Sequence, residues 1–132
     1  MTHANHQLAQ KFFAALSSGD VPDDLLTADM TAWTTTSGTT DKARYQGGIK
    51  LLASIFSGGL AYSVDSLTAE EDRVAAEVQS RGTLLNGDVF HNVYVFLIRI
   101  RNGRIASVAE HFNPAPVTEK ILPLLQVAMS KR

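Results

Sequence analysis

The stretch DVFHNVYVFLIRIRNGRIASVAEHFNPAP, residues 88–116, decides the fold of this chain. It predicts two strands joined by a tight turn at Asn102-Gly103, because Asn-Gly between two β-rich runs is a strong hairpin signal. Val, Phe, Tyr and Ile dominate the first arm, which is typical of a largely buried strand. The second arm carries Glu110 among apolar neighbours and should end at Asn113-Pro114, since proline cannot donate to a strand ladder.

The periodicity outside this hairpin predicts an α+β domain. Helical spacing of apolar residues indicates helices over 3–16, 21–28, 41–57 and 117–129, while alternation indicates further strands over 29–37, 60–70 and 73–85. Residues 38–41 read as a loop. Gly47-Gly48 either lie inside the third helix or mark its true start, and Pro123 should kink or break the last one.

This order of elements places the helices against one face of an antiparallel sheet. We expect a single domain over residues 1–132, since domains cluster near about 100–150 residues. A curved sheet wrapped around helices leaves a concave pocket, which is a natural place for a small ligand.

Composition excludes several classes of protein. A formal charge of −1 argues against a nucleic-acid surface, and no apolar run approaches the roughly 20 residues of a membrane span. The absence of cysteine excludes disulfides and Cys-ligated zinc. No GxSxG, P-loop or GxGxxG motif occurs, and His91 and His111 lack metal-site spacing, so we expect no metal and no cofactor. With no secretory signal or other address, cytoplasm is the expected location.

The face of the sheet that Glu110 occupies depends on register, because a slip of one residue exchanges the two faces. A two-residue turn pairs Arg101 with Arg104, whereas a three-residue loop pairs Ile100 with Arg104. We favour the three-residue loop at both Asn-Gly turns, which places Tyr94 opposite Glu110. The inner face then gathers Ala76, Val78, Asn92, Tyr94, Phe96, Ile98, Val108, Glu110 and Phe112.

The opposite face mixes charged and aliphatic side chains. It holds Glu77, Gln79, Arg81, His91, Val93, Val95, Leu97, Ala109 and His111. That mixture suits a partly covered outer face and favours a dimer contact.

Glu110 is the chemically sharpest candidate in the chain. A carboxyl in an apolar pocket has a raised pKa, because burial disfavours its charged form, and it can then act as a general acid or base near neutral pH. Tyr94 on the neighbouring strand is its expected partner, and Trp33 and Tyr45 are candidates to line the pocket. The alternative, which the sequence leaves open, is that Glu110 pairs with Arg81, Arg104 or a backbone donor at the rim.

At this point the chain resembles the nuclear transport factor 2-like superfamily, and within it the SnoaL-like and ketosteroid-isomerase-like branch. The resemblance rests on the order of four motifs: SSGD (17–20), TAW (31–33), RYQGGIKLLASIF (44–56) and VYVFLIRIRNGRIASVAEHFNP (93–114). It implies a cone-shaped α+β fold, a deep pocket and a homodimer through the outer sheet face.

The resemblance carries activity over only in part. Positions that bear the acids and the tyrosine of ketosteroid isomerases fall on Phe12, Phe96 and Thr34, which cannot do that chemistry. The Arg-x-Asp pair of limonene-epoxide-hydrolase-like members is absent. SnoaL-type cyclases use an acidic pocket residue, and phenazine-biosynthesis proteins of this fold carry a glutamate shortly before Asn-Pro, a pattern that Glu110 and Asn113-Pro114 match.

Three hypotheses follow from these observations. The first is a cofactor-free isomerase or cyclase acting on an apolar carbonyl or polycyclic compound. Glu110 and Tyr94 would be catalytic, and a ligand site would be formed by Trp33, Tyr45, Asn92, Phe96, Phe12, Val108 and Phe112. The second is a non-catalytic module that binds a small apolar ligand in the same pocket. The third is a dimeric association domain that works through its outer sheet face.

Overall fold

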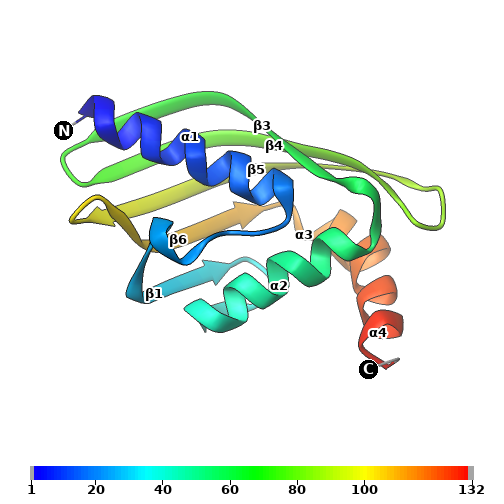
Figure 1. The fold of residues 1–132 in the computed structure, drawn as a ribbon. Helices are drawn as coiled ribbons and strands as arrows, with labels where there is room; N and C mark the ends of the chain where they lie inside the picture. Colours follow the sequence, from blue (N-terminus) through cyan, green and yellow to red (C-terminus); the bar gives the residue numbers. More distant parts are fainter. Residues whose placement is uncertain (1, 131–132) are drawn as a thin grey trace.

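The computed structural model describes residues 2–130, in which one curved sheet carries α1 and α2 on the same face (Figure 1). The helical elements are α1 (Thr2–Ser18), η1 (Asp23–Leu25), α2 (Lys42–Ser54), α3 (Pro114–Pro116), η2 (Val117–Ile121) and α4 (Leu122–Ser130). The strands are β1 (Leu26–Thr34), β2 (Gly38–Asp41), β3 (Phe56–Glu70), β4 (Arg73–Leu84), β5 (Val89–Arg101) and β6 (Arg104–Phe112).

The six strands lie in the order β2-β1-β6-β5-β4-β3. The predicted α+β class with a curved sheet against the N-terminal helices is confirmed. One pair differs from the antiparallel expectation, because β1 runs parallel to β6 while the other neighbours are antiparallel. This parallel pair joins an early strand, β1, to the last strand, β6, in the interior of the open sheet.

Two expectations near β1 were wrong. Residues 21–28 were predicted to be helical, but only the short 3-10 turn η1 forms and β1 already begins at Leu26. Residues 38–41 were predicted to be a loop, but they form β2 and pair with β1. Both segments carry β-branched threonines, and pairing with neighbouring strands satisfies their backbone better than an isolated turn of helix.

Helix α2 begins at Lys42, and Asp41 is its N-cap, since the Asp41 carboxylate accepts a hydrogen bond from the Arg44 backbone N–H at 2.8 Å. Gly47 and Gly48 therefore lie inside the helix and do not mark its start. The cap and the packing of Tyr45 and Ile49, both buried, outweigh the unfavourable helix propensity of the two glycines.

The two hairpins use different turns. The β4–β5 hairpin has a three-residue loop, residues 85–87, closed by the hydrogen bond from the Leu84 N–H to the Asp88 carbonyl, and it pairs Val78 with Tyr94, as predicted. The β5–β6 turn has two residues, Asn102 and Gly103, both at positive φ, and pairs Arg101 with Arg104. That turn was predicted wrongly, because positive φ at both central positions is the two-residue geometry that Asn-Gly favours.

A register shift past this turn restores the predicted faces. The pairing slips between Arg99 and Ile100, so that Phe96 and not Tyr94 lies opposite Glu110. The turn and the shift together displace β6 by two residues from the predicted pairing, and an even displacement keeps every side chain on its face. The inner-face residues are accordingly buried, apart from a partly buried Phe112, and the predicted outer-face residues of β5 are exposed.

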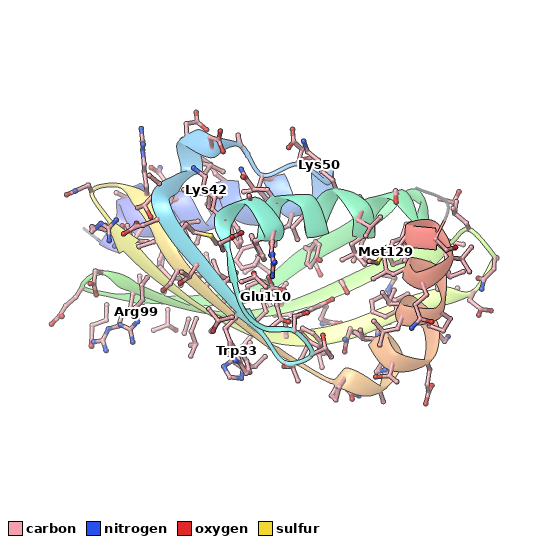
Figure 2. The ribbon with its side chains drawn as sticks, turned by 90° about the horizontal axis from the view of Figure 1, so that it is seen from below. Trp33, Lys42, Lys50, Arg99, Glu110 and Met129 are labelled. Atoms are coloured by element: carbon pink, nitrogen blue, oxygen red, sulfur yellow. The ribbon has the colours of Figure 1, made fainter. Side chains whose placement is uncertain are left out.

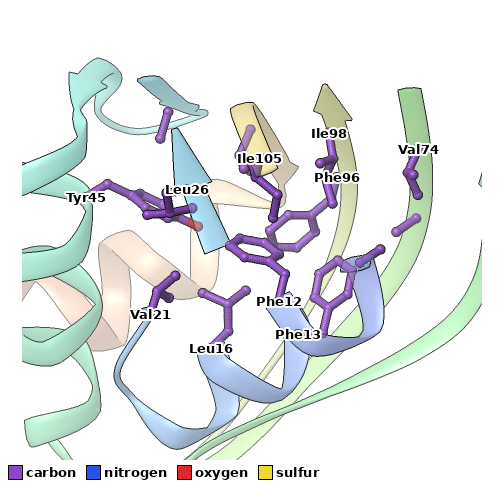
Figure 3. Close-up of a cluster of buried hydrophobic side chains, with 14 of the residues drawn as sticks. Phe12, Phe13, Leu16, Val21, Leu26, Tyr45, Val74, Phe96, Ile98 and Ile105 are labelled. Carbon is purple, nitrogen blue, oxygen red and sulfur yellow. The ribbon is translucent and has the colours of Figure 1, made fainter. Parts of the chain in front are cut away.

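The main core lies between α1 and the inner face of the sheet (Figure 3). Phe12 and Phe13 of α1 meet Phe96 of β5 edge to face, with ring centroids 6.3 and 4.9 Å from Phe96. A second cluster forms where the C-terminal helices meet the far end of the sheet. It comprises Ile55, Phe56, Leu60, Leu84, Phe90 and Ile121.

The C-terminal helix does not break at Pro123. A π-helical turn over Val117–Ile121 precedes the proline and leads into α4, which continues to Ser130. In a regular α-helix the proline ring would meet the carbonyl of Glu119, and the wider turn relieves that clash. Within residues 2–130, no helix is long and apolar enough to cross a membrane.

Candidate functional site

A cavity of about 230 Å³ lies between the two hydrophobic clusters. Its aromatic lining comes from the inner faces of β3, β5 and β6 and from α2, and comprises Tyr45, Tyr62, Phe90, Tyr94 and Phe112. Aliphatic side chains of α2, η2 and α4, among them Leu52, Ile121 and Leu125, complete the apolar wall. The helices therefore close one side of a hollow that the curved sheet forms on the other.

In the described range 2–130, Glu110 is the single carboxylate that lines this cavity. It is buried, at 6% exposure, and Figure 2 places it between α2 and the sheet. The Tyr45 hydroxyl donates a hydrogen bond to Glu110 Oε2 at 2.5 Å. Burial raises the pKa of Glu110 to about 7, and the hydrogen bond from Tyr45 lowers it in part.

The alternative that Glu110 pairs with an arginine at the rim is not what the structure shows. Among the residues that the structure describes, no basic side chain forms an ion pair with Glu110. Its side-chain partner is the neutral Tyr45, so the carboxyl can gain or lose a proton close to neutral pH.

Two further phenols lie in the same cavity. Tyr94 shares a hydrogen bond with Ser80 Oγ at 2.7 Å, and its ring centroid lies 5.7 Å from that of Tyr62. Burial is the main cause that raises the pKa of both phenols above its ordinary value. They therefore remain protonated at neutral pH and can donate hydrogen bonds to an oxygen atom of a ligand.

Polar side chains gather on another part of the lining. They come from the end of β1, the β1–β2 turn, β2 and the first turn of α2, and comprise Thr34, Thr36, Ser37, Thr40 and Arg44. Arg44 is exposed and is the basic residue of the lining. The cavity is thus apolar over most of its surface, with one acid, several phenols and a polar rim.

The structure brings four of the nine sequence-predicted site residues into this lining, namely Glu110, Tyr94, Tyr45 and Phe112. Phe12, Phe96 and Val108 lie instead in the main core, each at most 2% exposed. Their inward direction was predicted, but α1 packs directly on this part of the sheet and leaves no space beside them.

Trp33 and Asn92 need separate corrections as pocket residues. Trp33 pairs with Ala109 across β1 and β6 and therefore points to the outer face, where its ring lies 4.6 Å from that of His111 (Figure 2). Asn92 is buried, but its side-chain N–H donates to the Asn113 carbonyl and its side-chain oxygen accepts from the Val93 N–H. It holds the end of β6 in place and does not line the cavity.

Sequence reasoning missed Tyr62 and Arg44. Tyr62 lies opposite Ser80 and therefore shares the inner face with Val78. The sequence did not show this, because β3 alternates only weakly and contains two register shifts, each of which interrupts the alternation. Tyr62 is the one aromatic residue in the predicted strand 60–70, and this was the available signal. For Arg44, the N-cap at Asp41 places it in the first turn of α2, yet nothing local shows which way the helix faces.

No group of three or more acidic or histidine side chains that could hold a metal ion occurs in the described part of the chain. His91 bonds to Gln79 on the outer face, and His111 stacks on Trp33. What the cavity offers chemically is proton transfer by a carboxyl, with phenols as hydrogen-bond donors.

Comparison with known proteins places this fold among named relatives. An NTF2-like protein from Anabaena variabilis ATCC 29413 is 26% identical, with a TM-score of 0.73 over 84% of this chain and 87% of that one. AclR from Streptomyces galilaeus, a proposed hydroxylase, is 19% identical, with a TM-score of 0.78 over 96% and 87% of the two chains. A proposed SnoaL-like polyketide cyclase from Jannaschia sp. CCS1 is 14% identical, with a TM-score of 0.78 over 92% and 93%.

A search of curated proteins found no match. The sequence profile of the SnoaL-like domain, in contrast, matches residues 9–108, which span α1 through the first half of β6. Together with the NTF2-like fold of the structural neighbours, this match shows that the chain belongs to the SnoaL-like domain family.

Proposed function

We propose that this protein is a cofactor-free enzyme that moves a proton on a small carbonyl compound, in an isomerisation or a ring closure. The observation that carries the proposal is the buried Glu110 carboxyl, which lines an apolar cavity and has a pKa of about 7. A group with this pKa is present in both protonation states near neutral pH, which suits a residue that must first accept and then return a proton.

The chemistry would use the cavity as follows. Glu110 as carboxylate removes a proton from the carbon beside the carbonyl group, and the electron pair moves to the carbonyl oxygen. In this proposal Tyr94 and Tyr62, which both line the cavity, donate hydrogen bonds to that oxygen. In a substrate with a conjugated double bond, the protonated Glu110 then gives the proton to the far carbon of the enolate, and the electron pair on oxygen moves back to re-form the carbonyl group. Tyr45 holds the Glu110 carboxyl in one orientation throughout.

A probe reaction tests the acid–base role before any natural substrate is known. 5-Nitrobenzisoxazole loses a C–H proton to a general base while its N–O bond breaks, and the phenolate product absorbs visible light. We expect the protein to accelerate this reaction, with a rate that rises as pH passes through about 7, because the base is the ionised carboxylate. Glu110→Gln should remove the acceleration.

The matched control for this experiment is Glu77→Gln, which makes the same change on the exposed outer face. It should leave the rate unchanged. Equal rates for the wild type and Glu110→Gln would exclude Glu110 as the base.

A non-catalytic binding module is the second candidate. The sequence resemblance favours it, because the positions at which it implies catalytic residues of ketosteroid isomerases hold Phe12 and Phe96, and both pack in the core. This candidate predicts that small apolar compounds bind saturably, that binding survives Glu110→Gln, and that the probe reaction is not accelerated by the wild type.

We also propose that the chain forms a homodimer through its outer sheet face. Val93, Val95 and Leu97 of β5 are all between 44% and 52% exposed, and Trp33 lies on the same face. Exposed aliphatic side chains in the central strands of a sheet are typical of a contact surface.

A further inference from the structure

The lining of the cavity combines two chemically different sets of side chains. One set consists of Arg44 and the hydroxyl side chains of β1, β2 and the turn between them, and the other includes Ile121, Leu122 and Leu125 of the C-terminal helices. A ligand that is apolar throughout would not use the charge of the exposed Arg44 guanidinium or the hydrogen-bonding capacity of the hydroxyl groups. A ligand with one polar end would match both parts of the lining.

Arg44 carries a charge that has no acidic counterpart within residues 2–130. The other two basic residues of α2 each have an acidic neighbour, since Lys42 pairs with Asp23 and Lys50 with Asp20. In the part of the chain that the structure describes, no carboxylate forms an ion pair with the Arg44 guanidinium. The nearby Asp41 carboxylate is engaged as the N-cap of α2.

Arg44 and Glu110 share the cavity, yet they act separately. Burial and the Tyr45 hydrogen bond account for the pKa of Glu110, and the charge of Arg44 is not among the causes. The guanidinium is therefore available to an anionic group of a ligand while Glu110 faces another part of the same molecule.

The volume of the cavity limits the size of that molecule. At about 230 Å³ it exceeds a cavity of about 150 Å³, which accepts one benzene ring, and lies below the range of about 300–1,000 Å³ for drug-sized ligands. One ring, or two fused rings, is the size that such a space holds.

We propose that the ligand of this pocket is a one- or two-ring carboxylate. Arg44 and the hydroxyl side chains of the polar rim bind its carboxylate group, and its ring lies against the apolar wall beside Glu110. This inference rests on the proposed function only in using the same pocket. It names Arg44 as the residue that selects acids over their neutral analogues.

A pair of matched probes tests it. 2-Naphthoate and 2-naphthamide have the same two-ring body and differ in charge, and their affinities are measured by calorimetry at pH 6, where Glu110 is mostly protonated and does not repel the acid. We expect the wild type to bind naphthoate between about three- and tenfold more tightly, which is the range of a partly exposed charge-assisted contact.

Two variants assign the preference. Arg44→Gln should abolish the difference between the probes and leave naphthamide affinity nearly unchanged. Lys50→Gln removes the same charge from an exposed position on α2 outside the cavity lining, and it should retain the preference. Equal affinities of the wild type for both probes, a preference that survives Arg44→Gln, or no binding of either probe would each overturn the proposal.

The outcome is separable from that of the proposed function. Arg44→Gln removes the cationic side chain of the polar rim and keeps the Glu110 carboxyl, whereas Glu110→Gln removes the carboxyl and keeps Arg44. If the naphthoate preference depends on Arg44 but Glu110→Gln leaves the probe reaction unchanged, the ligand class stands and the catalytic proposal fails. The reverse result would retain the catalysis and exclude the carboxylate ligand.

Discussion

At the scale of single residues, the pair formed by Tyr45 and Glu110 determines what this site can do. Burial favours the neutral form of the Glu110 carboxyl, and one hydrogen bond from a phenol partly offsets this effect. The balance leaves the carboxyl near the midpoint of its titration at neutral pH. Removing either contribution should therefore change a measurable pKa.

Tyr45→Phe should raise the pKa of Glu110 further above its ordinary value, because the hydrogen bond from Tyr45 stabilises the ionised form. Carbon-detected NMR titration of the Glu110 carboxyl measures the change. Tyr94→Phe is the matched control, since the Tyr94 hydroxyl bonds to Ser80 and not to Glu110. A pKa that stays the same in Tyr45→Phe would mean that this hydrogen bond does not form in solution.

The pKa of Glu110 also predicts how stability depends on pH. The carboxyl titrates near 4.5 in the unfolded chain and at about 7 in the folded protein, so the folded state binds the proton more tightly. The resulting stabilisation is complete below pH 4.5 and is lost as pH rises to about 7. It amounts to about 3 kcal/mol, at about 1.36 kcal/mol for each pH unit between the two pKa values.

Glu110→Gln should remove this pH dependence, because the amide has no proton to lose and can still accept the hydrogen bond from Tyr45. Urea unfolding at pH 4.5 and pH 8 measures it. The variant should resemble the wild type at pH 4.5 and be more stable than the wild type at pH 8. A wild type that gains stability relative to the variant between these two pH values would contradict the burial of the acid.

At the scale of elements, the sequence of α2 carries two residues that disfavour helix formation. Gly47 and Gly48 lie in its interior, and a Cβ added at Gly47 would meet no neighbouring atom. The helix forms because Asp41 caps its start and Tyr45 and Ile49 pack beneath it. The same helix supplies Tyr45 and Arg44 to the cavity lining, so the position of α2 decides where both side chains lie in the cavity.

Gly47→Ala should stabilise the protein by about 0.5–1 kcal/mol, because alanine loses less backbone entropy in a helix and finds open space at this site. Urea unfolding measures the gain. Gly103→Ala is the contrasting variant. Its position in the β5–β6 turn has φ +76°, so alanine should there cost about 1–2 kcal/mol. Destabilisation by Gly47→Ala would mean that α2 is not a regular helix at this position.

At the scale of the whole molecule, the sheet separates two surfaces with different uses. Its inner face forms the core and the cavity, while its outer face presents Trp33 (Figure 2) together with Val93, Val95 and Leu97 of β5. Leu97, Ala109 and Trp33 lie in one row across β5, β6 and β1. A continuous apolar row across central strands is the surface that a second copy of the chain would cover.

Sedimentation should show a dimer that Val93→Asp converts to a monomer, because a charge buried in an apolar contact has no partner. Val127→Asp is the matched control. Val127 on α4 is 50% exposed and Val93 is 52% exposed, but α4 lies away from the outer sheet face. A monomeric wild type, or a dimer that survives Val93→Asp and dissociates with Val127→Asp, would contradict the proposed interface.

The sequence by itself determined which side chains share a face of the sheet. Alternation along β4, β5 and β6 places Glu110 on the same face as Tyr94 and Phe96. The turn type was predicted wrongly, but the pairing was in error by an even number of residues, so every side chain stayed on its predicted face. The sequence also determined the α+β class, since the strong hairpin and the amphipathic segments are local patterns.

The tertiary structure alone decided which inward residues border empty space. Phe12, Phe96 and Val108 face inward as predicted, yet α1 covers them, whereas Tyr45, Tyr62 and Arg44 meet Glu110 in one cavity only after α2 and β3 close around it. The parallel pairing of β1 with β6 set the direction of Trp33 in the same way. These features depend on contacts between segments far apart in the chain, and no local pattern of residues records the position of a helix over a sheet.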